Sequence, residues 1–561
     1  MNTLFIVLFF LLFVFEGTGL FSVNSFLPFF YILLASLLSL FVLLSRGRIK
    51  FPKAASLLYF LFLLFSLVSA LFFSVDKQSS FETWLVYAAF FLFFIFFYNH
   101  KLNEDLFFFL LSFAGFVFSL IYLLTVLFPL YVNLLPQTAY QFLYQYVASH
   151  NHLGDYLGLL IIGYFYYFYQ SKKAVYLLFS IALFILLFVF SSRSAYMSVL
   201  ISLYFLISVY AKSNERKITK IIYFILLGLM IFIFTATSQQ GRRLIDEKLF
   251  RKNSSSLYYD QKDLFANRTE YLRQASLAFF KRPFFGAGLN NFIHESKLLR
   301  KEYSAASSTT HNIFLDILVE TGAFSFIFFT LLIFLLFKKS SKRSLMFYTS
   351  VYLLANFQSD YTFKISGFLA LLFISLSQIY KEDDEWQNSS LLPVFSILLL
   401  AAVSLIFLSS IFIYKGLYKA SVIVYPLNIY SYKSIIEENI AQDKIKAKKY
   451  MTKLEWIAGG NTQVLTYLGS VNETFGNHKD ARDYYQKAYD ANPLISFDVI
   501  KKIYYYKKLF ESNKEADLYL ERALRYYKEH ISEWLFKRQI RKEVVKFCRK
   551  EKLMICTTLG W

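Results

Sequence analysis

The chain has 561 residues, of which 57% are hydrophobic, 21% aromatic and 17% charged. This composition excludes an all-soluble enzyme, because the aromatic residues lie in apolar runs that are too long for the strands of a soluble core. It also excludes disorder over most of the length, because disordered chains are poor in apolar residues. The formal net charge is +21, and its meaning depends on where the basic residues lie along the chain.

Apolar runs recur from the N-terminus to residue 414. A helix needs about 20 residues to cross a bilayer, so the shorter runs must extend into the polar residues beside them. The first run has no basic segment before it and no clear cleavage site, and we interpret it as a span rather than as a signal peptide. The runs predict an all-α polytopic membrane protein with about 12 or 13 transmembrane helices. They are Leu4–Phe15, Phe26–Leu44, Ala54–Phe73, Trp84–Tyr98, Leu106–Phe128, Leu153–Tyr169, Ala174–Phe190, Ser194–Tyr210, Ile218–Thr235, Ile313–Phe337, Leu345–Phe357, Phe363–Tyr380 and Leu391–Tyr414.

Lysine and arginine residues concentrate in some of the connections between these runs. The basic connections are at residues 46–53, 172–173, 212–220 and 338–343, and all of them fall on one side of the membrane. The short connections on the other side carry few basic residues. The positive-inside rule therefore makes the basic side cytoplasmic. Because the basic residues follow the membrane topology, we expect no nucleic-acid partner.

This orientation places two large segments outside the membrane, the loop from Ser238 to Thr310 and the tail after Tyr414. The loop is basic although it faces away from the cytoplasm. One interpretation is a solvated loop beside anionic lipid, since long loops escape the orientation rule. The other is a loop that binds a phosphate-bearing ligand. Its basic residues are Arg242, Arg243, Lys248, Arg251, Lys252, Lys262, Arg268, Arg273, Lys281, Arg282, Lys297, Arg300 and Lys301.

The tail has an internal period. Ala447 recurs as Ala481 and again as Ala516, a period of about 34 residues, within amphipathic helical segments. This spacing resembles that of tetratricopeptide repeats, whose helix pairs bury their apolar faces only by stacking. The resemblance implies a groove for a peptide or another protein. The alternative is a tail that docks on its own membrane domain or on anionic lipid headgroups.

The hydropathy and the period together predict the domain organisation. We expect a transmembrane domain at residues 1–414, a linker at 415–430 and a helical repeat domain at 431–561. The two cysteines, Cys548 and Cys556, have no Cys or His partner at metal-ligand spacing, so we expect no metal site. We expect two free thiols, with a single disulfide as the alternative if this end faces an oxidising compartment.

Two polar segments with arginines stand out from the apolar background on the outer side. Arg193 lies in the sequence Ser-Ser-Arg-Ser at a membrane interface, where it either reaches lipid headgroups or holds an anion. Arg268 begins an amphipathic helix that Pro283 ends, and Gly286 and Gly288 then allow a tight loop. A lone Gly-x-Gly marks a turn more often than a phosphate site.

A third segment contains His311 and lies where the large loop enters the next span. Thr310 or Asn312 is suited to cap this helix, which would place His311 beside the positive end of the helix dipole. The dipole lowers the pKa of an imidazole and favours the neutral form that accepts a proton. A histidine in a cap is often structural, but the two arginine segments lie on the same side of the membrane and favour a functional role.

Together these motifs resemble those of the O-antigen ligase and polymerase superfamily of bacterial membrane enzymes. The resemblance depends on the Ser-Arg element at Arg193, the Arg268 element with its Gly-Ala-Gly loop, and the His-Asn element at His311 and Asn312, and it covers roughly residues 1–414. It implies a GT-C-like fold. It also implies a metal-independent, inverting glycosyltransferase that needs no cofactor and uses an undecaprenyl-diphosphate-linked glycan as its donor.

The resemblance further implies roles for individual residues. Arg193 and Arg268 would bind the donor diphosphate, because guanidinium groups are planar and bidentate donors. His311 would take the proton from the acceptor hydroxyl, or alternatively hydrogen-bond the donor. Second-rank candidates for the diphosphate are Arg273 and Arg282, and the supporting residues are Asn312, Gly286 and Gly288.

The sequence leaves the acceptor open. A ligase would transfer a finished glycan to a lipid, protein or other carrier, and a polymerase would extend the glycan on its lipid carrier. Other classes are a non-catalytic polysaccharide or lipid transporter or flippase, and a membrane scaffold. Asp155, Asp316, Asp360 and Lys364 lie near predicted helix ends, which argues against transport. We expect a multi-pass protein of the bacterial cytoplasmic membrane whose partners are the bilayer, the donor, the acceptor and a protein bound by the tail.

Overall fold

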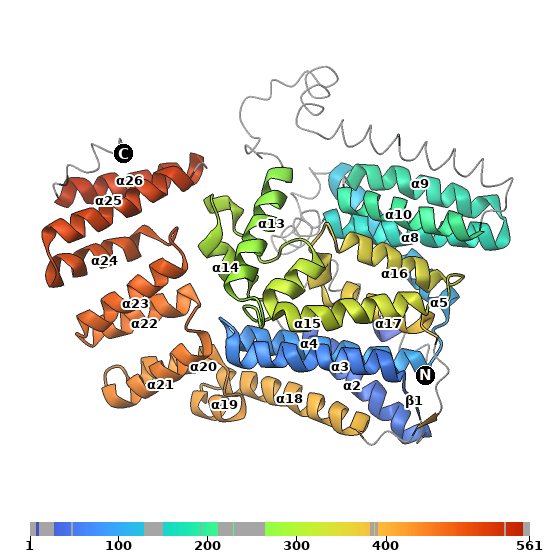
Figure 1. Ribbon diagram of the computed structural model, residues 1–561, viewed down its shortest axis with the longest axis horizontal. Coiled ribbons are helices and arrows are strands. Elements are labelled where there is room, and N and C mark those ends of the chain that lie inside the picture. The colour runs from blue at the N-terminus through green and yellow to red at the C-terminus, as the bar shows by residue number, and fades with distance from the viewer. Residues whose placement is uncertain are drawn as a thin grey trace, which may run out of the picture.

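The computed structural model describes residues 7–9, 27–46, 49–127, 150–190, 192–210, 228, 264–381, 386–387, 391–531, 534–551 and 553. Nearly all of the first apolar run and of the run at 218–235 lies outside the described residues, as does the large loop before residue 264. The described part is a bundle of helices with a stack of further helices at one end (Figure 1).

The fold is all-α and polytopic, as the sequence predicts. Within the described residues, Lys53–Phe73, Lys77–Asn99, Ile313–Lys338 and Leu392–Tyr414 are long and apolar enough to cross a membrane, and shorter apolar helices accompany them. The total number of spans stays a prediction. The bundle helices are α2 (Leu27–Arg46), α3 (Lys53–Val68), α4 (Lys77–Asn99), α5 (Glu104–Leu127), α8 (His150–Ser171), α9 (Ala174–Phe190), α10 (Arg193–Tyr210), α15 (Ile313–Lys338), α16 (Leu345–Asn356), α17 (Ser366–Ile379) and α18 (Leu391–Tyr414).

Shorter elements connect the bundle helices. The strands β1 (Ile49–Lys50) and β2 (Trp386–Gln387) pair antiparallel, with Ile49 opposite Gln387. The π-helix η1 (Ser69–Phe73) continues α3, and the 3-10 helix η3 (Thr362–Lys364) precedes α17. The loop before α15, which the sequence predicts on the outer side, contributes α13 (Leu264–Lys281), α14 (Phe292–Leu299) and the 3-10 helix η2 (Tyr303–Ala305).

Aromatic rings fill the centre of the bundle around α4. Tyr59 of α3 stacks on Phe373 of α17, with ring centroids 5.1 Å apart and 10° between the ring planes. Phe90 of α4 stacks on the same Phe373 ring from 5.9 Å. The Tyr59 hydroxyl donates a hydrogen bond to the carbonyl of Tyr87 at 3.0 Å, so even this buried polar atom is satisfied. Because α4 is apolar on nearly all sides, it takes the central position.

The helix α15 is broken near its middle. Gly322 has φ 78° and ψ 178°, which are not helical angles. The amides of Ala287 and Gly288 donate to the carbonyls of Val319 and Glu320 at 3.1 and 2.7 Å. In a continuous helix those carbonyls would accept from amides four residues later. The loop at 283–288 therefore fills the break and supplies the hydrogen bonds that the helix lost.

Glycines permit this close approach. Gly286 and Gly288 have φ angles of 67° and 94°, a region that residues with a side chain rarely adopt. A Cβ added to Gly286 would lie 2.5 Å from the carbonyl carbon of Glu320, and one added to Gly322 would lie 2.1 Å from the carbonyl oxygen of Phe284. The backbones of the loop and of α15 can therefore meet only without side chains at these positions.

Replacing Gly322 by Ala should strongly destabilise the protein, because the new Cβ would overlap a backbone carbonyl and the φ angle would be strained. We expect a loss of about 4 kcal/mol or more, measured as a lower thermal midpoint of the detergent-purified chain. Gly416→Ala is the matched control, because Gly416 has φ 72° but has no atom within 4 Å of an added Cβ. The control should cost about 1 kcal/mol from backbone strain alone. Equal losses in both variants would contradict the packing described above.

The tail forms a stack in which the helices from residue 429 to residue 530 pack successively side by side, and the last helix contacts the helix at 497–510 (Figure 1). Gly469 lies so close to the ring of Tyr485 that an added Cβ would be 2.8 Å away. Small residues thus allow α22 (Thr462–Thr474) and α23 (His478–Ala491) to approach, as in helical repeats. The segment predicted as a linker contains the short helix α19 (Tyr418–Val424), and the tetratricopeptide assignment stays a prediction. The tail helices are α20 (Ile429–Asn439), α21 (Lys444–Ala458), α22 (Thr462–Thr474), α23 (His478–Ala491), α24 (Phe497–Phe510), α25 (Asn513–His530) and α26 (Trp534–Glu551).

The tail contacts the start of α4. The Lys77 ammonium donates to the carbonyl of Trp456 at 2.8 Å and lies 4.9 Å from the centre of its ring. The Asn461 amide donates to a carboxylate oxygen of Asp76 at 3.1 Å, while the other oxygen of Asp76 caps α4. The tail thus docks on the membrane domain, which is one of the two alternatives that the sequence left open.

A second contact joins the tail to the outer loop. The buried guanidinium of Arg300 donates to the Asn492 side chain at 2.9 Å and to the carbonyl of Leu494 at 3.4 Å. It also donates to the carbonyl of Tyr303 at 2.7 Å and packs over the ring of that residue, 4.6 Å from its centre. Loop and tail therefore lie at the same end of the bundle.

Replacing Arg300 by Met should loosen the tail, because several buried acceptors lose their donor. We expect a cost of about 3 kcal/mol, seen as faster amide hydrogen exchange in α14 and around the turn between α23 and α24. Arg522→Met is the matched control, because Arg522 is exposed on α25 and its replacement should leave exchange unchanged. Unaltered exchange in the Arg300 variant would show that the tail is held by other contacts.

The expectation of two free thiols was wrong. Cys548 is disulfide-bonded. The only other cysteine of the chain, Cys556, lies outside the described residues. A disulfide persists in an oxidising compartment, which agrees with a tail outside the cytoplasm.

Candidate functional site

The turn that contains His311 leads directly into α15. Asn312 is the N-cap, and its side-chain oxygen accepts hydrogen bonds from the amides of Phe314 and Leu315 at 3.0 and 3.1 Å. The expectation that Thr310 or Asn312 caps this helix is therefore confirmed for Asn312. His311 has a φ of 58°, which is uncommon for a residue with a side chain. The cap and this angle together fix where the imidazole points.

The imidazole of His311 lies between two tyrosine rings. Tyr271 of α13 stacks on it, with centroids 5.2 Å apart and 13° between the planes. Tyr361, just before η3, meets it edge-on at 5.6 Å. Within the described residues, no group hydrogen-bonds either ring nitrogen. The two rings therefore fix the orientation of the imidazole without hydrogen-bonding its nitrogens.

The surroundings keep the imidazole neutral. Burial lowers the pKa of His311 below its ordinary value, and the nearby guanidinium of Arg268 lowers it further. The carboxylates of Asp360 and Asp316 act in the opposite direction without reversing the shift. The sequence anticipated a low pKa from the helix dipole, but the main cause is burial. At neutral pH the ring is therefore able to accept a proton.

Arg268 lies three residues before Tyr271 on α13, so both side chains extend from one face of that helix. Its side chain is half-buried. Among the described residues, no carboxylate forms an ion pair with Arg268, whereas other arginines of the segment have such partners. A half-buried guanidinium without a carboxylate is well placed to bind an anionic group.

Arg273 and Arg282, the second-rank candidates, are already engaged. Arg273 donates two hydrogen bonds to the carboxylate of Glu270, at 2.7 and 2.6 Å. Arg282 donates to the carbonyl of Phe73 at 3.3 Å and lies 3.8 Å from the carboxylate of Glu295. Arg273 also donates to the carbonyl of Leu299 at the end of α14, so both arginines connect α13 with its neighbours. The two residues hold the outer loop in place, and a phosphate would have to displace these bonds to reach them.

The segment around Arg193 meets the histidine segment through Asp360. Arg193 is the first residue of α10, and its side chain lies outside the described part. The next residue, Ser194, donates from its hydroxyl to the Asp360 carboxylate at 2.7 Å. Asp360 is followed by Tyr361, whose ring contacts His311. The three segments that the sequence singled out therefore converge at one end of the bundle.

A buried polar network, which sequence reasoning missed, lies beside this meeting point. The Asn356 side chain donates to the carboxylate of Asp155 at 2.7 Å and accepts from the Thr362 hydroxyl at 2.5 Å. Asp155 and Asp360 are both buried. Acidic residues within apolar runs were the available signal, but the sequence cannot show which segments they join.

Lys364 forms a second group that the sequence did not identify as part of the site. Its ammonium lies 3.1 Å from the carboxylate of Asp316 and 3.1 Å from that of Glu320. The Asp316 carboxylate also accepts from the amide of Thr310 at 2.6 Å, next to His311. One cation thus links η3, α15 and the turn that holds the histidine.

The Gly-Ala-Gly loop supports the site without presenting its amides to a ligand. The amide of Gly286 donates to the carbonyl of Arg282, and the amides of Ala287 and Gly288 donate to carbonyls of α15. All three donors are therefore used internally. In the part of the chain that the structure describes, no group of three or more His, Cys, Asp or Glu residues could hold a metal ion.

One comparison with known proteins bears on these residues. Residues 177–330 match the family model described as O-antigen ligase. No curated protein matches the chain. The matched segment contains every site residue that the sequence singled out, from Arg193 to Asn312, while Asp360 and Lys364 follow it. Residues 177–330 are thus similar to the O-antigen ligase family, which supports the superfamily that the sequence motifs resemble.

Proposed function

We propose that the protein is a membrane glycosyltransferase that moves a glycan from an undecaprenyl-diphosphate-linked donor to an acceptor hydroxyl. The observation that carries the proposal is the proximity of a neutral imidazole, His311, to the guanidinium of Arg268, which no described carboxylate neutralises. A base beside such a cation suits attack by a hydroxyl and departure of a diphosphate. The similarity of residues 177–330 to O-antigen ligases supports the same class of reaction.

The proposed reaction is a single displacement. The acceptor oxygen bonds to the anomeric carbon from the face opposite the diphosphate, so the configuration at that carbon inverts. The carbon–oxygen bond to the diphosphate breaks, and its electron pair leaves with the diphosphate. The acceptor proton passes to a ring nitrogen of His311. Arg268, together with Arg193 in this proposal, stabilises the negative charge of the leaving group, and the scheme needs no metal ion or cofactor.

A lipid flippase or transporter is the competing function. Two features of this chain are typical of transporters, namely a broken helix, here α15, and a buried ionisable residue, here Lys364. In transporters the broken backbone binds the substrate or its coupling ion. Here the carbonyls freed by the break in α15 accept hydrogen bonds from the Gly-Ala-Gly loop, and Lys364 is paired with two carboxylates. This arrangement favours a fixed scaffold for catalysis.

The location and partners follow from the same proposal. Apolar helices make the chain a multi-pass membrane protein, and we propose the bacterial cytoplasmic membrane with loop and tail outside. The disulfide-bonded Cys548 of the tail supports this orientation. The acceptor is a glycan, lipid or protein. Ligase, polymerase and protein O-oligosaccharyltransferase activities therefore all remain compatible with the proposal, because each transfers a glycan to a hydroxyl. We propose that the tail is a domain of tetratricopeptide-like repeats and that its exposed face binds a protein partner.

Incubation of the purified full chain with a polyprenyl-diphosphate-linked glycan and candidate acceptors should yield a glycosylated acceptor, identified by mass spectrometry. His311→Ala should slow transfer by about 10²–10⁴-fold, because the general base is lost. Arg268→Gln should weaken donor binding, and Arg268→Lys should restore it only in part, because an ammonium is not bidentate.

Arg522→Gln, at an exposed position of the tail, is the control for charge removal and should transfer normally. Full activity of the His311 variant would remove that residue from the mechanism. Movement of the donor lipid across vesicle membranes, without any transfer product, would favour the flippase.

The rate of transfer should fall at acidic pH as His311 becomes protonated. Because burial and Arg268 lower the pKa of His311, the midpoint of this fall should lie below the ordinary histidine pKa of about 6.5. In the Arg268→Gln variant the midpoint should move to higher pH, because the repelling charge is gone. The check is kcat/KM measured across the acidic range. A midpoint above the ordinary value, or a downward shift in the variant, would contradict the assignment of the base.

A further inference from the structure

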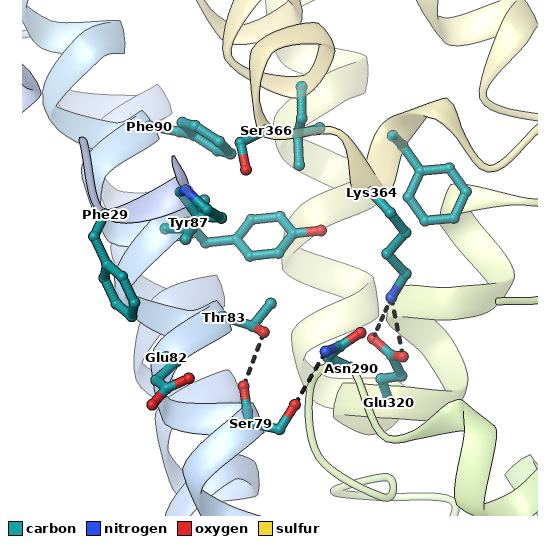
Figure 2. A pocket seen from close by; sticks show the side chains of 14 residues that line it. Phe29, Ser79, Glu82, Thr83, Tyr87, Phe90, Asn290, Glu320, Lys364 and Ser366 are labelled. Atoms are coloured by element: carbon teal, nitrogen blue, oxygen red, sulfur yellow. Dashed lines mark hydrogen bonds and ion pairs between the residues drawn. The ribbon is translucent and has the colours of Figure 1, made fainter. Parts of the chain in front are cut away.

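A cavity of about 260 Å³ is bordered by Lys364 and Glu320. Figure 2 shows its two walls: Ser79, Glu82 and Thr83 from α4 on one side, and Lys364 with Glu320 on the other. Glu320 and Lys364 thus contribute to the cavity as well as to the cluster that reaches the turn of His311. The wall of the cavity is therefore connected to the turn of His311 through Lys364 and Asp316.

The polar groups of the cavity are held in place by hydrogen bonds. The Asn290 amide donates to the Ser79 hydroxyl at 3.0 Å. One carboxylate oxygen of Glu82 accepts from Gln78 at 3.0 Å and from the Tyr425 hydroxyl at 3.2 Å. Among the described residues, no hydrogen bond to the other oxygen of Glu82 is seen. The wall therefore offers a fixed carboxylate, a hydroxyl and an amide to a ligand.

Aromatic rings complete the lining. Phe29, Tyr87, Phe90 and Phe363 border the same space as the polar groups, and the ring of Tyr87 extends across it in Figure 2. A sugar ring has hydroxyls around its edge and apolar C–H faces, so it can meet such a wall with both kinds of contact. A hydrocarbon chain in this space would leave the second carboxylate oxygen of Glu82 without a polar partner, which is costly.

We propose that this cavity is a subsite that binds one sugar residue of the transferred or accepting glycan. The inference depends on the proposed function, because it is this chemistry that brings a glycan to the outer end of the bundle. The volume is below the roughly 300–1,000 Å³ of pockets for drug-sized ligands, so it suits a single sugar ring. Glu82, Ser79 and Asn290 bind the hydroxyls, and the aromatic rings bind the faces of the sugar.

Protection of an introduced cysteine tests the subsite. Ser79→Cys, and separately Thr83→Cys, are made in the full chain with Cys548→Ser and Cys556→Ser, and labelling by a maleimide is timed. The probes are the free oligosaccharide released by mild acid from a polyprenyl-diphosphate-linked glycan, and undecaprenyl phosphate without sugar. The oligosaccharide should slow labelling by the factor 1 + [L]/Kd, about tenfold at ten times the dissociation constant. The lipid alone should not slow it.

Ser470→Cys is the matched control, because this exposed serine of α22 lies in the tail and does not line the cavity. Neither probe should change the rate at which it is labelled. Equal protection by undecaprenyl phosphate would overturn the sugar subsite in favour of a lipid pocket. Transfer activity without protection at either cysteine would also overturn it. Protection by the oligosaccharide without any transfer would keep the subsite and overturn the proposed function, so the two failures are distinguishable.

Discussion

The candidate site depends on the backbone pairing between the loop at 283–288 and the break in α15. Unpaired carbonyls in an apolar bundle cost several kcal/mol each, so a broken helix is tolerated only where other donors replace its own. The amides of Ala287 and Gly288 are those donors. The paired loop connects α13, which carries Arg268 and Tyr271, to the helix that His311 precedes. The same interaction that repairs α15 therefore fixes the arginine relative to the histidine.

Buried charges define the other side of the site. Lys364 lies between the carboxylates of Asp316 and Glu320, and Asp360 accepts from Ser194 of α10. Buried ion pairs add little net stability, because desolvation offsets their attraction, but removing one partner is strongly destabilising. In this chain they join segments that are distant in sequence, and two of their members, Lys364 and Glu320, also line the cavity that contains Glu82. We interpret these charged residues as groups that fix the relative positions of the segments they join.

The tail belongs to the same structural unit as the membrane domain. Arg300 of the outer loop is buried against the turn between α23 and α24, and Asp76 and Lys77 bind the tail where α4 begins. Tyr425, just before the tail helices, donates to Glu82 in the wall of the cavity. A partner that binds the tail would therefore act on a surface that is physically continuous with the proposed subsite. Helical repeats commonly pack through one face and leave another face free to bind a partner.

The sequence by itself determined the class of the fold, because apolar runs of this length can satisfy their backbone in a bilayer only as helices. It also limited the cap to Thr310 or Asn312 and predicted the helical tail, since both depend on local residue types and spacing, and the structure then assigned the cap to Asn312. The roles of Asp360, Tyr361 and Lys364 were decided by the tertiary structure, because contact between distant segments leaves no periodic signal in one chain. The low pKa of His311 likewise arises from burial, with the rings of Tyr271 of α13 and Tyr361 just before η3 against it. Burial is a property of packing, and only the folded chain creates it.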